Sequence, residues 1–161
     1  MDPDWQIGRF ELPHMCKVMC RKLVKIPVKV FGTDPGMLPM VIDKGLEVPA
    51  VLVQIRDIME ELGAFKAEGI FRVAGVETEM IRLKECFNSG QPLESNNCHS
   101  MGTMLKRWYK ELPTSVFQSV PEEAGDNETA SLDVTTYMST TYKNIYLWLL
   151  DVLAHTASFQ E

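Results

Sequence analysis

One arginine of this chain lies in an apolar run with a glycine on either side. Arginine is a residue type that can take part in a chemical reaction. The run reads Glu68-Gly69-Ile70-Phe71-Arg72-Val73-Ala74-Gly75. Burying an unpaired guanidinium in such a run would cost several kcal/mol. Arg72 therefore either pairs with a buried carboxylate or points outward at a partner. The flanking glycines favour sharp backbone turns that could lift the side chain clear of the surface.

Two lysines further along the chain are the next candidates. Residues 98–112 show the spacing of an amphipathic helix, with Met101, Leu105 and Trp108 on one stripe and Leu112 continuing it. Lys106 and Lys110 are i, i+4 neighbours on the opposite side, with Thr103 near them. From spacing alone, the pair is either a solvated face or a basic contact surface for a partner.

Motifs for autonomous catalysis are missing from the sequence. It contains no GxxxxGK[ST] loop, no Rossmann fingerprint, no GxSxG elbow and no HExxH pair. The cysteines, Cys16, Cys20, Cys86 and Cys98, form no paired CxxC pattern, so we expect reduced thiols and no metal site. The sequence therefore shows no motif of its own for binding a nucleotide or for catalysis.

Periodicity predicts a largely helical domain with no strand of any length. Helices are expected over residues 49–62, 76–89, 98–112 and 136–157, with Gly63 and Gly90 ending the first two. Residues 27–39 and 113–133 carry loop signals, and residues 1–14 are polar and irregular. Residues 14–25 could form a short basic helix that either faces solvent or touches anionic lipid.

The composition agrees with a soluble, cytosolic module. The formal net charge is −6, which argues against general nucleic-acid binding. Neither a signal peptide nor an apolar run of membrane-spanning length is visible in the sequence.

Four short motifs together resemble the Rho GTPase-activating (RhoGAP) domain family. They are Val30-Phe31-Gly32-Thr33-Asp34, Val48-Pro49-Ala50-Val51-Leu52, the run from Glu68 to Gly75, and His99 followed by Leu105-Lys106-Arg107-Trp108-Tyr109-Lys110-Glu111-Leu112-Pro113. The resemblance implies an all-α fold that activates a Rho, Rac or Cdc42-like GTPase. Arg72 would be the arginine finger supplied in trans, and Lys106 and Lys110 would bind the GTPase. GTP and Mg²⁺ would belong to the GTP-bound partner, so no cofactor of the chain's own is expected.

The sequence departs from the family pattern at two places. Lys110 stands where the family usually has arginine, so a bidentate fork is replaced by a point charge. The family also continues into further helices, whereas this sequence ends at Glu161. We therefore expect an N-terminal extension over residues 1–29 and a C-terminally incomplete RhoGAP domain over residues 30–161.

The missing helices would leave apolar surface on the last helix, which predicts self-association through it. The alternative to a GTPase activator is a non-catalytic module that keeps the fold and binds GTPases or other proteins. We expect a cytoplasmic location, with recruitment to membrane through the GTPase partner as a further hypothesis.

Overall fold

The computed structural model describes residues 29–91, 93, 95–122 and 134–159, so the expected extension and its basic helix lie almost wholly outside the described residues. Its helices are η1 (Pro35–Met37), α2 (Ala50–Glu61), η2 (Ala64–Lys66), α3 (Glu77–Ser89), α4 (Cys98–Lys110), η4 (Val134–Tyr137) and α5 (Thr140–Ala157). Two short strands, β1 (Met40–Asp43) and β2 (Leu46–Pro49), precede α2. The predicted all-α class is confirmed in its main point, because helices make up most of the described fold.

The hairpin of β1 and β2 corrects the prediction that no strand is present. The strands pair antiparallel, with Val41 opposite Val48. Lys44 and Gly45, at the turn, have positive φ values of 49° and 81°, which matches the backbone of a two-residue hairpin turn. Each strand has only four residues, and Ile42 in β1 is 71% exposed. Alternation between apolar and polar residues is therefore too short to be recognised in the sequence.

Local signals account for the helix ends. Gly63 and Gly90 adopt left-handed backbone after α2 and α3, with φ of 64° at both positions, as predicted for helix terminators. The Asn97 side chain accepts hydrogen bonds from the backbone N–H groups of His99 and Ser100 and so caps α4. The last long helix was expected from residue 136, but residues 134–137 form η4 and α5 begins at Thr140.

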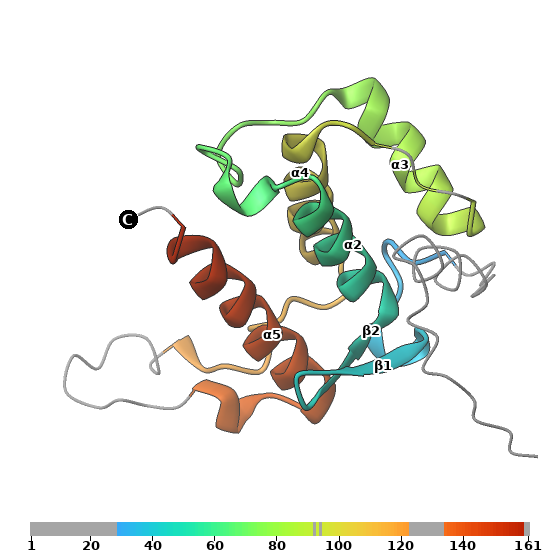
Figure 1. Cartoon of the computed structure of the whole chain (residues 1–161). Coiled ribbons are helices and arrows are strands. Elements are labelled where there is room, and N and C mark those ends of the chain that lie inside the picture. Colours follow the sequence, from blue (N-terminus) through green and yellow to red (C-terminus); the bar gives the residue numbers. More distant parts are fainter. Residues whose placement is uncertain (1–28, 92, 94, 123–133, 160–161) are drawn as a thin grey trace, which may run out of the picture.

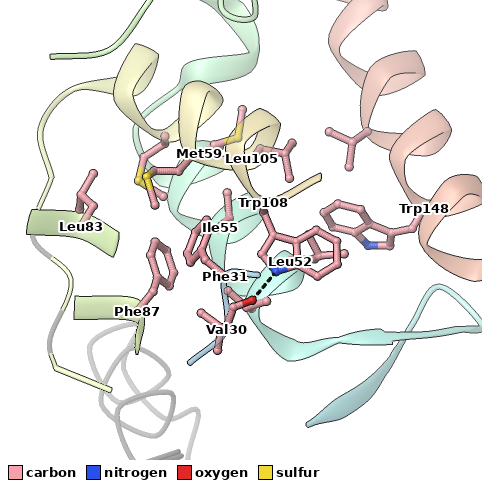
Figure 2. Packing of buried hydrophobic residues seen from close by; sticks show 14 of the residues in the cluster. Val30, Phe31, Leu52, Ile55, Met59, Leu83, Phe87, Leu105, Trp108 and Trp148 are labelled. Carbon is pink, nitrogen blue, oxygen red and sulfur yellow. Dashed lines mark hydrogen bonds between the residues drawn. The ribbon is translucent and has the colours of Figure 1, made fainter. Parts of the chain in front are cut away.

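The helices pack around one apolar core. Figure 1 shows α2 and α4 side by side at the centre, with α3 and α5 on opposite sides of them. Trp108 of α4 is buried between residues of α2 and α5, and its indole N–H donates a 3.0 Å hydrogen bond to the carbonyl of Val30 (Figure 2). Other buried members of this core are Phe31, Leu52, Ile55, Met59, Leu83, Leu105, Ile145, Trp148 and Val152. The helix that carries the two candidate lysines is therefore held in the core by its opposite face.

A polar network joins the hairpin to α2 and α5. Asp43 of β1 accepts hydrogen bonds from Arg56 of α2 and from the indole N–H of Trp148, the latter at 2.8 Å. Burial disfavours the charged carboxylate, but the hydrogen bonds from Arg56 and Trp148 outweigh it, so the pKa of Asp43 lies below its ordinary value. These hydrogen bonds satisfy the carboxylate, the guanidinium and the indole N–H, which would otherwise be desolvated beside the core without a partner.

The outer surface of α5 carries apolar side chains opposite its buried stripe. Leu150 and Leu153 are exposed by 43% and 41%, while Ile145, Trp148 and Val152 are buried. Self-association through this helix stays a prediction. Within the described residues, no helix is both long and apolar enough to cross a membrane.

Candidate functional site

Arg72 lies on the surface, in the loop of residues 67–76 that joins η2 to α3. Its side chain is 81% exposed, and its guanidinium is 4.0 Å from the carboxylate of Glu68, which is itself 96% exposed. An ion pair at that distance between two solvated side chains adds little stability and does not fix the guanidinium. Of the two alternatives left by the sequence, the geometry is that of a presented cation and not of a buried ion pair.

The two flanking glycines have different roles in the loop. Gly69 has a left-handed φ of 67°, and its carbonyl accepts hydrogen bonds of 2.8 Å from the backbone N–H groups of both Arg72 and Val73. This tight turn raises Arg72 from the surface, as predicted. Gly75 lies against α4 instead, because a Cβ at that position would be 2.6 Å from the Ser100 Cα. Gly75 therefore permits close approach of two backbones, which the sequence prediction of a second sharp turn did not anticipate.

Helix α4 lies under the loop and contacts its backbone at two polar points. Lys106 donates from Nζ to the carbonyl of Phe71, the residue before Arg72, at 2.7 Å. Thr103 accepts at Oγ1 from the backbone N–H of Gly75 at 3.0 Å. The loop is therefore held by α4 immediately before the arginine and three residues after it.

Apolar contact between α4 and the loop is equally close. Gly102 lies inside α4, and a Cβ there would be 2.6 Å from the backbone carbonyl oxygen of Ile70. Glycine inside a helix is unfavourable by roughly 1 kcal/mol relative to alanine. At this position it lets the loop pack directly on the helix, and the Ile70 side chain is buried there.

Lys106 and Lys110 both face solvent, as their spacing predicted. Their helix buries Met101, Leu105 and Trp108 on the other side. Within the described part of the chain, Lys110 takes part in no hydrogen bond or ion pair. The two lysines therefore differ, because Lys106 has a partner in the loop, whereas Lys110 has no such partner among the described residues. Whether either binds a GTPase stays a prediction.

Hydrogen bonds and an ion pair hold the start of α3 against α4 and the residues just before it. Glu79 of α3 accepts hydrogen bonds of 2.6 Å from the hydroxyls of Ser95 and Ser100. Arg107 of α4 pairs with Glu77 at 3.2 Å. These contacts tie the start of α3, which directly follows the Arg72 loop, to the helix that carries the lysines. The α3 end of the loop is therefore fixed against α4.

Sequence reasoning missed Gly102 and the contact made by Thr103. Gly102 gave a usable signal, because a glycine within a helical pattern often marks close packing. Thr103 gave none, because its partner is a backbone N–H group far away in the sequence. Among the described residues, no cluster of His, Cys, Asp and Glu could hold a metal ion. In chemical terms, the loop presents an exposed guanidinium, and the helix that holds the loop presents two exposed ammonium groups. Such groups suit a partner with an anionic site.

Comparisons with known proteins show which proteins this chain is similar to. The model of the RhoGAP domain family matches residues 49–132, a stretch that contains Arg72, Lys106 and Lys110. The chain is 32% identical over 141 residues to Rho GTPase-activating protein gacA of Dictyostelium discoideum, with 86% of this chain and 42% of that protein covered. It is 27% identical over 160 residues to Rho GTPase-activating protein 2 of Arabidopsis thaliana, with 96% and 37% covered. Against Rho GTPase-activating protein 28 of Homo sapiens, the identity is 34% over 104 residues, with 55% and 14% covered. The chain thus spans less than half the length of these relatives.

Proposed function

Because this chain belongs to the RhoGAP domain family, we propose that it stimulates GTP hydrolysis by a Rho-family small GTPase in its GTP-bound form. One observation carries the proposal within this chain. Arg72 is 81% exposed. Its loop is held on α4 by two hydrogen bonds, one from the Gly75 N–H to the Thr103 hydroxyl and one from the Lys106 ammonium to the Phe71 carbonyl. An arginine that is exposed on a fixed loop is suited to enter the active site of another protein.

The proposed chemistry is electrostatic. During hydrolysis, negative charge redistributes over the γ-phosphoryl oxygens and the bridging oxygen of GTP. The GTPase supplies the nucleotide, Mg²⁺ and the positioned water, so the activator needs no cofactor. The guanidinium of Arg72 would neutralise the developing charge, and such a group contributes about 10³–10⁵ in rate, or roughly 4–7 kcal/mol of barrier. In this scheme the chain is an activator that completes a partner's active site and is not an enzyme by itself.

The two lysines would have separate parts in this mechanism. Lys106 already donates one hydrogen bond to the Phe71 carbonyl, and an ammonium group has three donors. It can therefore hold the loop and still contact the partner. Lys110 is free to meet an acidic surface near the nucleotide, where it would mainly speed association. We place this action in the cytoplasm, at membranes to which the GTPase partner is bound.

The test is phosphate release from GTP-loaded Rho, Rac, Cdc42, Ras and Rab proteins in the presence of the chain. Stimulation confined to the Rho group is expected. Arg72→Ala should lose most of the stimulation but keep the melting temperature and much of the GTPase affinity. Arg72→Lys should fail as well, because an ammonium group cannot span two phosphate oxygens as the planar guanidinium does. Arg82→Ala, which removes an exposed arginine of α3, is the matched control.

The same assay separates the second candidate, a non-catalytic GTPase-binding module. Lys110 favours this candidate, because a point charge stands where the family usually has arginine. A GTPase that binds the parent chain without faster hydrolysis would support the module and contradict the activator. Near-full stimulation by Arg72→Ala would show that the arginine is not the group that acts.

A further inference from the structure

Thr103 occupies a central position under the Arg72 loop. It lies on α4 one turn before Lys106, and residues three apart share a helix face. Its Oγ1 accepts the hydrogen bond from the Gly75 N–H at 3.0 Å and donates to the His99 carbonyl at 2.9 Å. Both contacts run through one hydroxyl, which therefore links the last residue of the glycine-flanked run to the backbone of α4.

The hydroxyl of Thr103 donates one of these two hydrogen bonds and accepts the other. A threonine hydroxyl has one O–H donor and two acceptor lone pairs. Bonding back to the carbonyl four residues earlier uses the donor, as helical threonines commonly do. The remaining lone pairs can only accept, and one of them meets the Gly75 N–H. Serine could make the same pair of bonds, whereas valine, which has the same shape, could make neither.

The position of the Arg72 guanidinium depends on how the backbone of its loop is held. Its side-chain contact is with Glu68 at 4.0 Å, and both side chains are exposed. Lys106 fixes the carbonyl of Phe71 on one side of the arginine. Without Thr103, the backbone from Arg72 to Gly75 would keep its packing on Ser100 but lose its polar contact with α4. A misplacement of about 1 Å can cost as much as 10² in rate when a reaction depends on positioning.

We propose that Thr103 is a positioning residue for GTPase activation, whose hydroxyl holds the Gly75 end of the Arg72 loop on α4. This inference rests on the proposed function, since the loop is positioned for a partner's nucleotide. Thr103 does not touch that nucleotide. It acts through the backbone of the loop, and it complements Lys106, which acts on the other side of Arg72.

Three variants test the proposal. Thr103→Val removes the hydroxyl, Thr103→Ser keeps it, and Thr156→Val is a matched control. Thr156 of α5 also donates to the carbonyl four residues earlier, that of Val152 at 2.8 Å. Two properties are measured. One is amide hydrogen exchange at Gly75 in the chain alone, and the other is the GTPase reaction, with the maximal stimulated rate separated from the affinity for GTP-loaded Rac.

Thr103→Val should speed exchange at the Gly75 amide about tenfold, which corresponds to the loss of one net hydrogen bond. The maximal stimulated rate should fall about tenfold or more, with affinity changed less than about twofold. Thr103→Ser and Thr156→Val should both resemble the parent in these measurements.

Three results obtained with the variants would overturn the proposal. The first is unchanged Gly75 exchange in Thr103→Val, which would show that the hydroxyl does not hold the loop. The second is an equal loss of rate in Thr103→Ser and Thr103→Val, which would assign the effect to packing. The third is faster exchange with an unchanged maximal rate. If the parent chain stimulates no GTPase, the proposed function fails, and the role of Thr103 in activation fails with it, whatever the exchange at Gly75 shows about the loop.

Discussion

Gly102→Ala offers a sharp test of how closely the Arg72 loop must sit on α4. A Cβ at this position would be 2.6 Å from the Ile70 carbonyl oxygen and 3.3 Å from two side-chain carbons of Ile70. Ordinary contact for a Cβ begins at 3.4 Å, so the loop and the helix must separate by about 0.8 Å. The obstacle is backbone, and a backbone cannot rotate out of the way as the end of a flexible side chain could.

Two effects of this substitution oppose each other. Alanine is favoured over glycine inside a helix by roughly 1 kcal/mol, which would stabilise α4. Displacement of the loop weakens the contact of Ile70 with the helix and stretches the bonds to Thr103 and Lys106. We expect the melting temperature to change little or fall by a few degrees. Stimulated hydrolysis should fall by about 10²-fold, because a shift close to 1 Å moves Arg72 away from its productive position.

The measurements are thermal unfolding and phosphate release at saturating activator. Gln54→Ala, at an exposed position of α2, controls for adding alanine to a helix elsewhere. A Gly102→Ala chain that melts higher than the parent and retains its full stimulated rate would refute the reasoning. It would mean that the loop tolerates displacement, or that its position does not determine the rate.

Further predictions follow from the surface charges and from the buried network around Asp43. Changing Lys110 to glutamate should slow association with the GTPase, most strongly at low salt, and leave the melt nearly unchanged. Adding Lys106→Glu should also lower the maximal stimulated rate, measured by phosphate release, because it removes the hydrogen bond to the Phe71 carbonyl. Lys110→Arg should tighten binding by restoring a bidentate fork; titration calorimetry at two salt concentrations measures both effects on binding. Asp43→Asn should lower the free energy of unfolding by about 1.5–3 kcal/mol near neutral pH, as for a hydrogen bond to a charged group. Because the pKa of Asp43 in the folded chain lies below its ordinary value of 3.8, this stabilisation is complete above about pH 4 and is lost as pH falls through the folded-state value. Denaturant titrations of parent and variant should therefore converge in acid, and a constant difference down to pH 2 would contradict the assignment.

Much of the fold could be predicted from local patterns in the sequence. The helical periods and the glycines at positions 63 and 90 predicted α2 and α3, and the apolar stripe through Trp108 predicted which side of α4 is buried. These features depend on neighbours within a few residues. The hairpin was missed because its strands are short and half exposed, so pairing and not periodicity defines them.

The candidate site also contains residues that the sequence predicted and contacts that it could not predict. Arg72 could be found from its own surroundings, because a charged residue in an apolar run needs an explanation. The alternative between a buried pair and a presented cation could not be decided without the fold, since it depends on which carboxylates come near. The contact of Thr103 with Gly75 spans 28 positions. A hydrogen bond between residues so far apart arises from packing between elements, and no periodic pattern in the sequence predicts it.

The hydrogen bond from Trp108 to the Val30 carbonyl has a consequence for where this folding unit begins. The two groups are 78 positions apart in the chain, and the neighbouring Phe31 is completely buried. A fragment limited to the family match, residues 49–132, would leave the indole N–H without its acceptor and the core without Phe31. It would also lack Ile145, Trp148 and Val152 of α5. Helix α4, which underlies the Arg72 loop, can therefore reach its final packing only after segments beyond both ends of the match have docked on it. The part of the chain that identifies the family is shorter than the part that must fold together.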